Sequence, residues 1–385
     1  MGLMEFFEDV EIKEGDKRAV LAFGGSLRDH YVFTPLTVMN TMANMNMDIH
    51  VDGMSKRSWK KQKYVEDFNQ LMKDTKKLMP VKKDPVPNPE EVDVVIMPCH
   101  GMTFWFGTPK MLKDRYPNAK IIAWNADPDA FSFDSKKFDY VISFHGRIGL
   151  WEELGIQLPG YWKDLEVEYK NRPENELFVP FIVDPDVFVP LEKWKDYILI
   201  QRAFDPDLPE DKRPAERKLE FIDAIIDAQL NGKKHIKKTF YGDNWDKNPR
   251  WWPPRNHWEY GGACHWREIP QIIGESSSIL QTVREIKKTT AKCIYTERIV
   301  NAFASESLLI SDQMTMIDEK LGLVDGKTFV ELSTNMDARA IAEKVNNVSN
   351  RQYNDIKRNA RNLAIQNYNM QDWAKCLDQF IQAIL

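Results

Sequence analysis

The motif Asp-Pro-Asp occurs three times in this chain, beginning at Asp127, Asp184 and Asp205. Two carboxylates at this spacing can bind a divalent metal ion, but Asp-Pro is also common in tight turns. A turn is favoured for Asp184 and Asp205. Asp127 differs because it follows the apolar run 120–124, which predicts a buried strand, and α/β proteins bind ligands where such strands end. A divalent metal stays open for this motif, but no cluster of ligands in the sequence indicates one.

Glycine, serine and histidine residues follow two other apolar runs. Gly25 and Ser26 come after the run 19–23, and His100 comes after the run 92–97. The Gly-Gly-Ser spacing by itself favours an ordinary turn between a strand and a helix, and the alternative is a backbone cradle for a phosphate or a sugar. Because parallel strands end at one edge of a sheet, we expect these residues on the same rim as Asp127.

Arg298 and Asn301 are three residues apart near the start of a helix predicted over 296–304. This spacing places both on one face of the helix. A diphosphate at the helix N-terminus would meet the helix dipole, free N–H groups and a guanidinium. A solvated surface helix explains the same pattern equally well, so the residues alone leave both interpretations open.

Two runs of basic residues lie in the first part of the chain. One contains Lys60, Lys61 and Lys63 with Trp59 among them, and a second covers 73–83. Basic runs with aromatic residues favour a surface that contacts nucleic-acid phosphates, although a solvated helix face is the usual explanation of any single run. The formal net charge of -5 argues mildly against nucleic acid.

Five tryptophans lie within the segment 244–266. This segment is either a loop that packs on itself or a platform that recognises a base or a sugar, and the sequence leaves both interpretations open.

Short apolar runs separated by helix-like segments predict two parallel sheets. The predicted strands are 19–23, 47–51, 92–97, 120–124 and 140–144 in the first half, and 197–200, 238–241, 279–283, 308–310 and 329–332 in the second half. The predicted helices are 37–45, 65–78, 214–230, 296–304, 337–348, 353–368 and 371–385. A proline-rich, extended connector at 178–190 separates the halves. The pattern predicts an α/β protein with two successive Rossmann-like domains.

Composition narrows the class of protein. The 385 residues are 43% hydrophobic and 29% charged, which suits two domains with a mixed-charge surface. The four cysteines are widely spaced and read as reduced thiols. The N-terminus lacks a signal-like apolar region, and no run approaches the roughly 18 apolar residues of a membrane span. We therefore expect a soluble, cytoplasmic protein that has no membrane partner.

Three segments resemble parts of the GT-B glycosyltransferases. VPFIVDPDVFVP resembles their interdomain connector, TERIVNAFASESLLISD resembles their donor-site helix, and the last helix, with Trp373, resembles the tail that crosses back to the N-terminal domain. The resemblance implies the GT-B fold, with an acceptor domain at 1–180 completed by the helix 370–385, a donor domain at 191–369, and a cleft between them. It also implies a UDP-sugar as co-substrate. Nucleotide-sugar epimerases share these features.

A closer resemblance is to the phage DNA β-glucosyltransferases of the T4 type. KIIAWNADPD resembles their strand that ends in the catalytic aspartate, which implies that Asp127 is the general base. ILIQRAFDPDLPEDKRPAERKLEFI resembles the turn whose arginines hold the diphosphate, which implies a donor-binding role for Arg202 and for Arg213 or Arg217.

The donor helix of that family supplies two further positions. Arg298 resembles its arginine, whereas Asn301 stands where the family has an acidic ribose-binding residue. An asparagine can still accept a hydrogen bond from one ribose hydroxyl and donate to another. The family's glycine pair before the first arginine is replaced here by Ile200-Gln201.

The resemblance implies an enzyme that transfers glucose or a pentose such as arabinose, with inversion, from a UDP-sugar to a hydroxymethylated base such as hydroxymethylcytosine in double-stranded DNA. Lys60, Lys61, Lys63 and His100 are then expected on the acceptor side, and Gly25 and Ser26 near the donor. We expect a phage-type enzyme that acts as a monomer. The alternatives are a GT-B transferase acting on a small molecule, glycan or protein, as in CgeB-type proteins, and an epimerase.

Overall fold

The computed structural model describes residues 17–23, 47–53, 70, 73–74, 88–99, 108–125, 135–143, 146–158, 174–200, 237–242, 258–264, 266–281, 297–312, 321–332, 340, 343–344 and 350–385. The chain divides into two compact units. Unit 1 comprises Met1–Asp184 and Met370–Leu385, and unit 2 comprises Pro185–Asn369. The C-terminal residues therefore belong with the N-terminal unit.

Unit 1 is built on a six-stranded parallel sheet with the order β2-β1-β3-β4-β5-β6. Its strands are β1 (Lys17–Phe23), β2 (Met47–Gly53), β3 (Val94–Cys99), β4 (Lys120–Asn125), β5 (Tyr140–Ser143) and β6 (Glu176–Phe178). Successive residues of β3 and β4, such as Val94, Val95, Ile121 and Ile122, are fully buried. Burial of consecutive residues means that both faces of the sheet are covered, as parallel sheets require.

Short helices and turns connect these strands. They are α3 (Thr108–Arg115) and α4 (Gly149–Glu153), with single turns of 3-10 helix at η2 (Pro89–Glu91) and η4 (Ser135–Lys137). Leu112 and Tyr116 from the end of α3 join a buried cluster with Val95 and Ile121, so this helix covers one face of the sheet.

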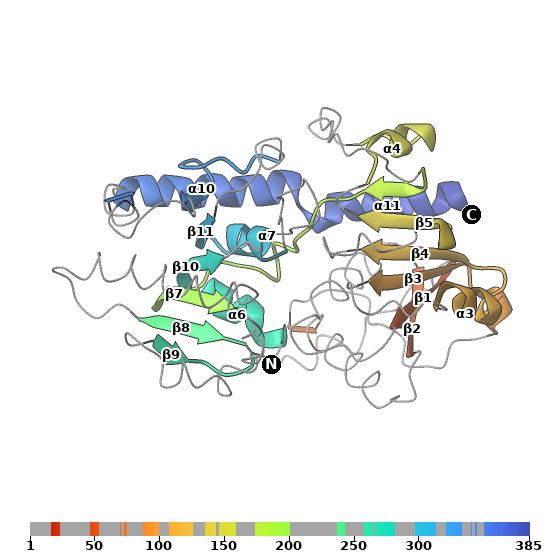
Figure 1. Ribbon diagram of the computed structural model, residues 1–385, viewed down its shortest axis with the longest axis horizontal. Helices are drawn as coiled ribbons and strands as arrows, with labels where there is room; N and C mark the ends of the chain where they lie inside the picture. The colour runs from red at the N-terminus through yellow and green to blue at the C-terminus, as the bar shows by residue number, and fades with distance from the viewer. Residues whose placement is uncertain are drawn as a thin grey trace, which may run out of the picture. The chain divides into compact units, whose positions relative to one another are not determined.

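The helix α11 (Met370–Ile384) completes the core of unit 1. Trp373 is fully buried against Trp151 of α4, with ring centroids 5.9 Å apart, and Phe380 meets Tyr140 of β5 edge-on at 5.2 Å. The indole N–H of Trp151 donates to the carbonyl of Phe178 at 2.8 Å. Figure 1 shows α11, in blue, beside β5.

Unit 2 contains a second six-stranded parallel sheet, with the order β12-β11-β10-β7-β8-β9. Its strands are β7 (Lys195–Ile200), β8 (Lys238–Tyr241), β9 (Trp258–Tyr260), β10 (Ser276–Gln281), β11 (Leu308–Asp312) and β12 (Val330–Leu332). The helices whose bounds are described are η8 (Trp266–Glu268), α6 (Ile269–Gly274), α7 (Glu297–Ala304) and α10 (Asn350–Asn367). Helix α10 packs against α7.

Both strand orders are doubly wound, so each sheet has a point where the order of strands reverses. In unit 2 the reversal lies between β7 and β10, and in unit 1 it lies between β1 and β3. Ligands of open α/β sheets bind outside the carboxyl ends of the strands at such points. The topology therefore marks one candidate ligand edge in each unit.

The described residues contain all ten strands expected from the sequence and two strands that were missed. The missed strands, β6 and β9, have three residues each. Phe178, which we assigned to the extended connector, is the last residue of β6 and pairs with Ser143. The expected turn at Asp184-Pro185-Asp186 is observed at 185–187.

Several expected elements fall wholly or partly outside the described residues. The helices predicted at 37–45 and 214–230 lie outside them. Of the helices predicted at 65–78 and 337–348, the described residues 70, 73–74, 340 and 343–344 are helical. Of the tryptophan-rich segment 244–266, the structure describes 258–264 and 266, which include β9.

The packing of α11 predicts a large loss of stability when Trp373 is truncated. We expect Trp373→Ala to lower the free energy of unfolding of unit 1 by about 3–5 kcal/mol, the usual cost of removing a buried tryptophan. Lys375→Ala on the same helix is the matched control, because its side chain is 76% exposed and pairs only loosely with Asp372. That control should change stability by less than about 0.5 kcal/mol. Equal effects in chemical denaturation would contradict this account of α11.

Candidate functional site: the carboxyl edge of the unit 2 sheet

The candidate site lies at the carboxyl edge of the unit 2 sheet. The strands that flank the reversal point are β7, which ends at Ile200, and β10, which ends at Gln281. Tyr241, the last residue of β8, pairs with Ile200, so it lies at the same edge. Helix α7 begins after β10, at Glu297. These elements bring one helix N-terminus and three strand ends toward a common edge.

Helix α7 is enclosed over nearly its whole length. Ile299, Val300, Ala302 and Phe303 have no exposed surface, and this apolar content explains why the segment is helical and buried. Beyond Ala304 the chain forms a Schellman motif, in which the N–H of Ser307 donates to the carbonyl of Ala302 at 2.9 Å. The helix is therefore fixed in place by packing and by its cap.

Arg298 is the second residue of α7 and retains partial exposure. Burial lowers the pKa of the Arg298 guanidinium to about 10, and the nearby Cys264 partly opposes this shift. The group is therefore still a cation at neutral pH. A partly desolvated cation at a helix N-terminus attracts a phosphate group strongly.

Asn301 lies one turn further along the same helix. It is only 4% exposed, and its backbone carbonyl accepts from the N–H of Ser305 at 3.1 Å. Sequence spacing correctly placed Arg298 and Asn301 on one helix, but their burial differs. The contact of Asn301 with a ribose stays a prediction.

A compact turn structure lies beside Arg298 and was missed by sequence reasoning. Gly261 donates its N–H to the carbonyl of Phe240, and Gly242 donates to Gly262, so the ends of β8 and β9 are tied together. A Cβ at Gly261 would lie 2.2 Å from the Tyr241 ring, which means that only glycine fits there.

Cys264 follows this turn and links two parts of the edge. Its buried side chain is close enough to affect both Arg298 and Tyr241, and burial first, then Cys264, raises the pKa of Tyr241 to about 12. Tyr241 therefore stays a neutral phenol at physiological pH. No motif or spacing in the sequence signals this proximity, because Cys264 and Arg298 are 34 positions apart.

The remaining predicted site residues lie outside the described residues, although four strands that precede them are observed. Residue 127 follows β4 by two positions, residue 100 follows β3 directly, residues 25 and 26 follow β1, and residue 202 follows β7. Strands β1 and β3 flank the reversal point of unit 1, and β7 flanks that of unit 2. The predicted residues concerned are Asp127, Gly25, Ser26, His100, Lys60, Lys61, Lys63, Arg202, Arg213 and Arg217.

Within the part of the chain that the structure describes, no three His, Cys, Asp or Glu side chains lie close enough to share a metal ion. Of the Asp-Pro-Asp motifs, the pairs beginning at Asp127 and Asp205 fall outside that part.

The fold defines the class of protein that this chain resembles. No protein-family model matches the chain, and no curated protein matches it in sequence. Solved structures with the same two-sheet architecture along nearly the whole chain include glycosyltransferases, and the fold is the GT-B fold.

Three of these structures illustrate the similarity. A glycosyltransferase from Rickettsia africae gives a TM-score of 0.57 at 14% identity, over 96% of this chain and 99% of that chain. Anabaena Alr3699/HepE, in complex with UDP and glucose, gives 0.54 at 11% identity, over 95% and 99%. AviGT4, a glycosyltransferase involved in avilamycin A biosynthesis, gives 0.51 at 11% identity, over 95% and 96%.

None of the described helices is long and apolar enough to cross a membrane.

The position of Arg298 predicts a direct contribution to binding a nucleoside diphosphate. We expect Arg298→Ala to weaken UDP binding by about 1.5–3 kcal/mol, the scale of a hydrogen bond to a charged group. Calorimetric titration with UDP measures this change. Arg358→Ala on α10 is the matched control, because that side chain is 66% exposed and pairs with Asp355 of its own helix. Unchanged UDP affinity in Arg298→Ala would remove Arg298 from the site.

Proposed function

We propose that this protein is a glycosyltransferase that takes a sugar from a UDP-sugar. The observation that carries the proposal is the partly desolvated Arg298 cation at the N-terminus of α7, at the carboxyl edge of a doubly wound sheet. That position is suited to a diphosphate. The similarity in fold to Anabaena Alr3699/HepE, whose structure contains UDP and glucose, supports the same donor class.

In the proposed donor complex, Arg298 and Arg202 hold the two phosphates. Arg202 follows β7 and α7 follows β10, and these are the strands on either side of the reversal point. Arg213 or Arg217 adds a further positive charge, Asn301 meets the ribose, and Gly25 and Ser26 lie near the sugar. As the glycosidic bond breaks, negative charge grows on the UDP oxygen, and fixed cations stabilise it more in the transition state than in the ground state.

The proposed reaction is a single inverting displacement. The acceptor hydroxyl oxygen attacks the anomeric carbon, the bond from that carbon to the UDP oxygen breaks, and Asp127 takes the hydroxyl proton. The support for Asp127 is its place two residues after β4, which pairs with β3 at the carboxyl edge of unit 1. A carboxylate accepts this proton without a metal ion.

The proposed acceptor is a hydroxymethylated base in double-stranded DNA. Its support is the sequence resemblance around Asp127 and Arg202, together with the basic runs that include Lys60, Lys61 and Lys63. A base inside a duplex must leave the stack before its hydroxymethyl group reaches a carboxylate in a site. His100, which directly follows β3, is proposed to contact this base.

The net charge of -5 favours a different acceptor, namely a small molecule, a glycan or a protein. Mass spectrometry of hydroxymethylated DNA after incubation with a panel of UDP-sugars separates the cases. A mass increase of one sugar supports the DNA acceptor. Consumption of donor with a second acceptor class, but never with DNA, moves the proposal to that class. Conversion of the UDP-sugar to an isomer without any acceptor identifies an epimerase.

The role of Asp127 is tested by Asp127→Asn. Asparagine keeps the shape and most hydrogen bonds of the aspartate but cannot accept the proton, so we expect the transfer rate to fall by roughly 10²–10⁴ with normal folding and UDP binding. Single-turnover transfer measures the rate. Asp129→Asn is the matched control. If Asp129→Asn is inactive and Asp127→Asn is not, the base is misassigned by two residues.

The role of the basic run is tested by replacing Lys60, Lys61 and Lys63 together with alanine. We expect weaker DNA binding and a shallower dependence on salt, with UDP affinity unchanged. Each phosphate contact that is lost reduces the number of counterions that binding releases from the DNA. The control replaces Lys110, Lys136 and Lys375 with alanine. These lysines are exposed residues of the same unit, and replacing them removes the same amount of positive charge. Equal losses in both triple variants would show that net charge, not a local surface, controls binding.

A further inference from the structure

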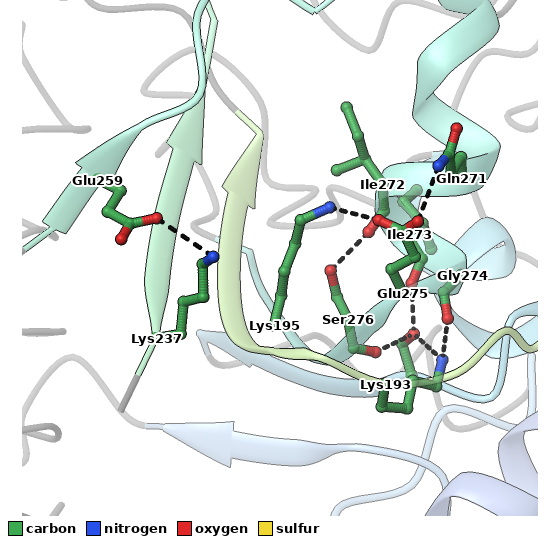
Figure 2. Close-up of polar contacts among 11 residues, drawn as sticks. Lys193, Lys195, Lys237, Glu259, Gln271, Ile272, Ile273, Gly274, Glu275 and Ser276 are labelled. Carbon is green, nitrogen blue, oxygen red and sulfur yellow. Dashed lines mark hydrogen bonds and ion pairs between the residues drawn. The ribbon is translucent and has the colours of Figure 1, made fainter. Parts of the chain in front are cut away.

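Lys193 connects three separate segments of unit 2. It lies in the stretch of chain that leads from unit 1 into β7, and its ammonium donates to the carbonyl of Gly274 at 2.6 Å and to the carbonyl of Ser305 at 2.8 Å. It also donates to the Ser307 hydroxyl at 3.1 Å. The first carbonyl ends α6, and the other two groups follow α7. Figure 2 shows Lys193 pointing toward Gly274.

The chain around Lys193 is held firmly in position. The N–H of Leu191 donates to the carbonyl of Gly274 at 3.1 Å, and the N–H of Trp194 donates to the carbonyl of Glu275 at 3.1 Å. A Cβ on Gly274 would lie 2.8 Å from the carbonyl oxygen of Val189, so this close approach requires glycine. The backbone therefore fixes where the Lys193 side chain begins.

Two cationic side chains donate hydrogen bonds at the C-terminus of α7. Its last turn is closed by Glu306 in the left-handed conformation, with φ at 52°, which costs about 1 kcal/mol or more for a residue with a side chain. Arg361 of α10 donates to the carbonyl of Ala304, and Lys193 donates to that of Ser305. Positive charge at a helix C-terminus is stabilising because it offsets the helix dipole.

We propose that Lys193 is a positioning residue for the donor site: by holding the C-terminus of α7, its ammonium sets the position of Arg298 at the other end of that helix. The proposal rests on the proposed function, because it assumes that Arg298 binds the diphosphate. Six of the eight residues of helix α7, from Ile299 to Ala304, are buried, so a shift of its last turn moves the whole helix.

The charge of Lys193 gives the proposal a pH signature. Burial, then Lys357, lowers the pKa of Lys193 to about 8; Glu306 opposes the shift and Arg361 adds to it. At pH 7 the ammonium has three N–H donors for its three acceptors. Above pH 8 the neutral amine has two donors, and the cation at the helix C-terminus is lost.

The effect on global stability has the opposite sign. The pKa of Lys193 is lower in the folded protein than the 10.5 of the free side chain. Between these two values the unfolded chain binds more protons than the folded chain, so this group's contribution to stability rises as pH increases. A loss of UDP affinity between pH 7 and pH 9 that depends on Lys193 is therefore not caused by unfolding.

The test is calorimetric titration of UDP at pH 7 and pH 9 with the full chain, Lys193→Met and Lys193→Arg. We expect Lys193→Met to bind UDP roughly 3- to 10-fold more weakly at pH 7, the scale of one or two hydrogen bonds. The parent should weaken more between pH 7 and pH 9 than Lys193→Arg, whose guanidinium stays charged. Ionisation of UDP itself affects both proteins equally.

Lys237→Met is the matched control. Lys237 is also a lysine at the amino end of the sheet, but its ammonium meets Glu259 at 3.6 Å and the Trp194 ring at 4.2 Å, away from α7. Figure 2 shows the pair formed by Lys237 and Glu259. UDP affinity should be unchanged in this variant. If Lys193→Met matches the parent in UDP affinity and in pH response, the proposal is overturned.

Hydrogen exchange without ligand separates failure of the inference from failure of the proposed function. The amides of Glu306 and Ser307, which donate to Phe303 and Ala302, should exchange faster in Lys193→Met. Unchanged exchange overturns the positioning role whatever UDP does. Faster exchange in a protein whose parent does not bind UDP shows that the donor assignment is wrong, and the inference about the donor site falls with it.

Discussion

The enclosure of α7 constrains the architecture of unit 2. The terminal N–H and C=O groups of a helix have no partner within the helix. Where the helix is buried, bulk water cannot hydrogen-bond to these groups, so other protein groups or a ligand must do so. At the C-terminus the partners are present: the Schellman motif uses the amides of Glu306 and Ser307, while Arg361 and Lys193 donate to the carbonyls of Ala304 and Ser305. At the other end, Arg298 lies in the first turn of the helix, which follows β10 at the edge where the strands end. The proposed donor site therefore uses the end of α7 opposite to its capped C-terminus.

The lysines at the amino edge of the sheet show how unit 2 tolerates buried charge. Lys195 is only 4% exposed, and its ammonium lies 2.7 Å from a carboxylate oxygen of Glu275. Burial alone would raise the pKa of Glu275, but hydrogen bonds from Lys195 and Gln271 lower it. A buried ion pair of this kind adds little net stability, yet removing one partner leaves an uncompensated charge. We interpret the pair as fixing the register between β7 and the start of β10.

Hydropathy predicted the bounds of a strand well where the apolar run coincides with the strand, and less well where polar residues belong to the strand or apolar residues lie outside it. The strand 238–241 was predicted with the observed bounds, but β10 starts at Ser276, three residues before its first apolar residue, because Ser276 and Ser278 are buried polar residues. The Ser276 hydroxyl donates to the carbonyl of Ile272, which satisfies it inside the core. The strand predicted at 92–97 starts two residues before β3. Val92 is apolar and buried, but it caps η2 instead of belonging to the strand. The missed strands β6 and β9 have three residues each, too few to show a pattern by themselves, whereas the equally short β12 lies within the predicted segment 329–332.

The candidate site also contains features that the sequence predicted and features that it did not. Spacing within one helix is a local property, so the sequence placed Arg298 and Asn301 together, and strand ends indicated the edge on which they lie. Other contacts join segments that are distant in sequence and meet only when the sheet assembles. Cys264 lies near Arg298, and Lys193 donates to the carbonyl of Ser305. Such contacts have no periodicity that a sequence can reveal. Strand ends and helix starts therefore predict where candidate ligand residues stand in the fold, whereas nothing in the sequence predicts the residues that hold those elements in place.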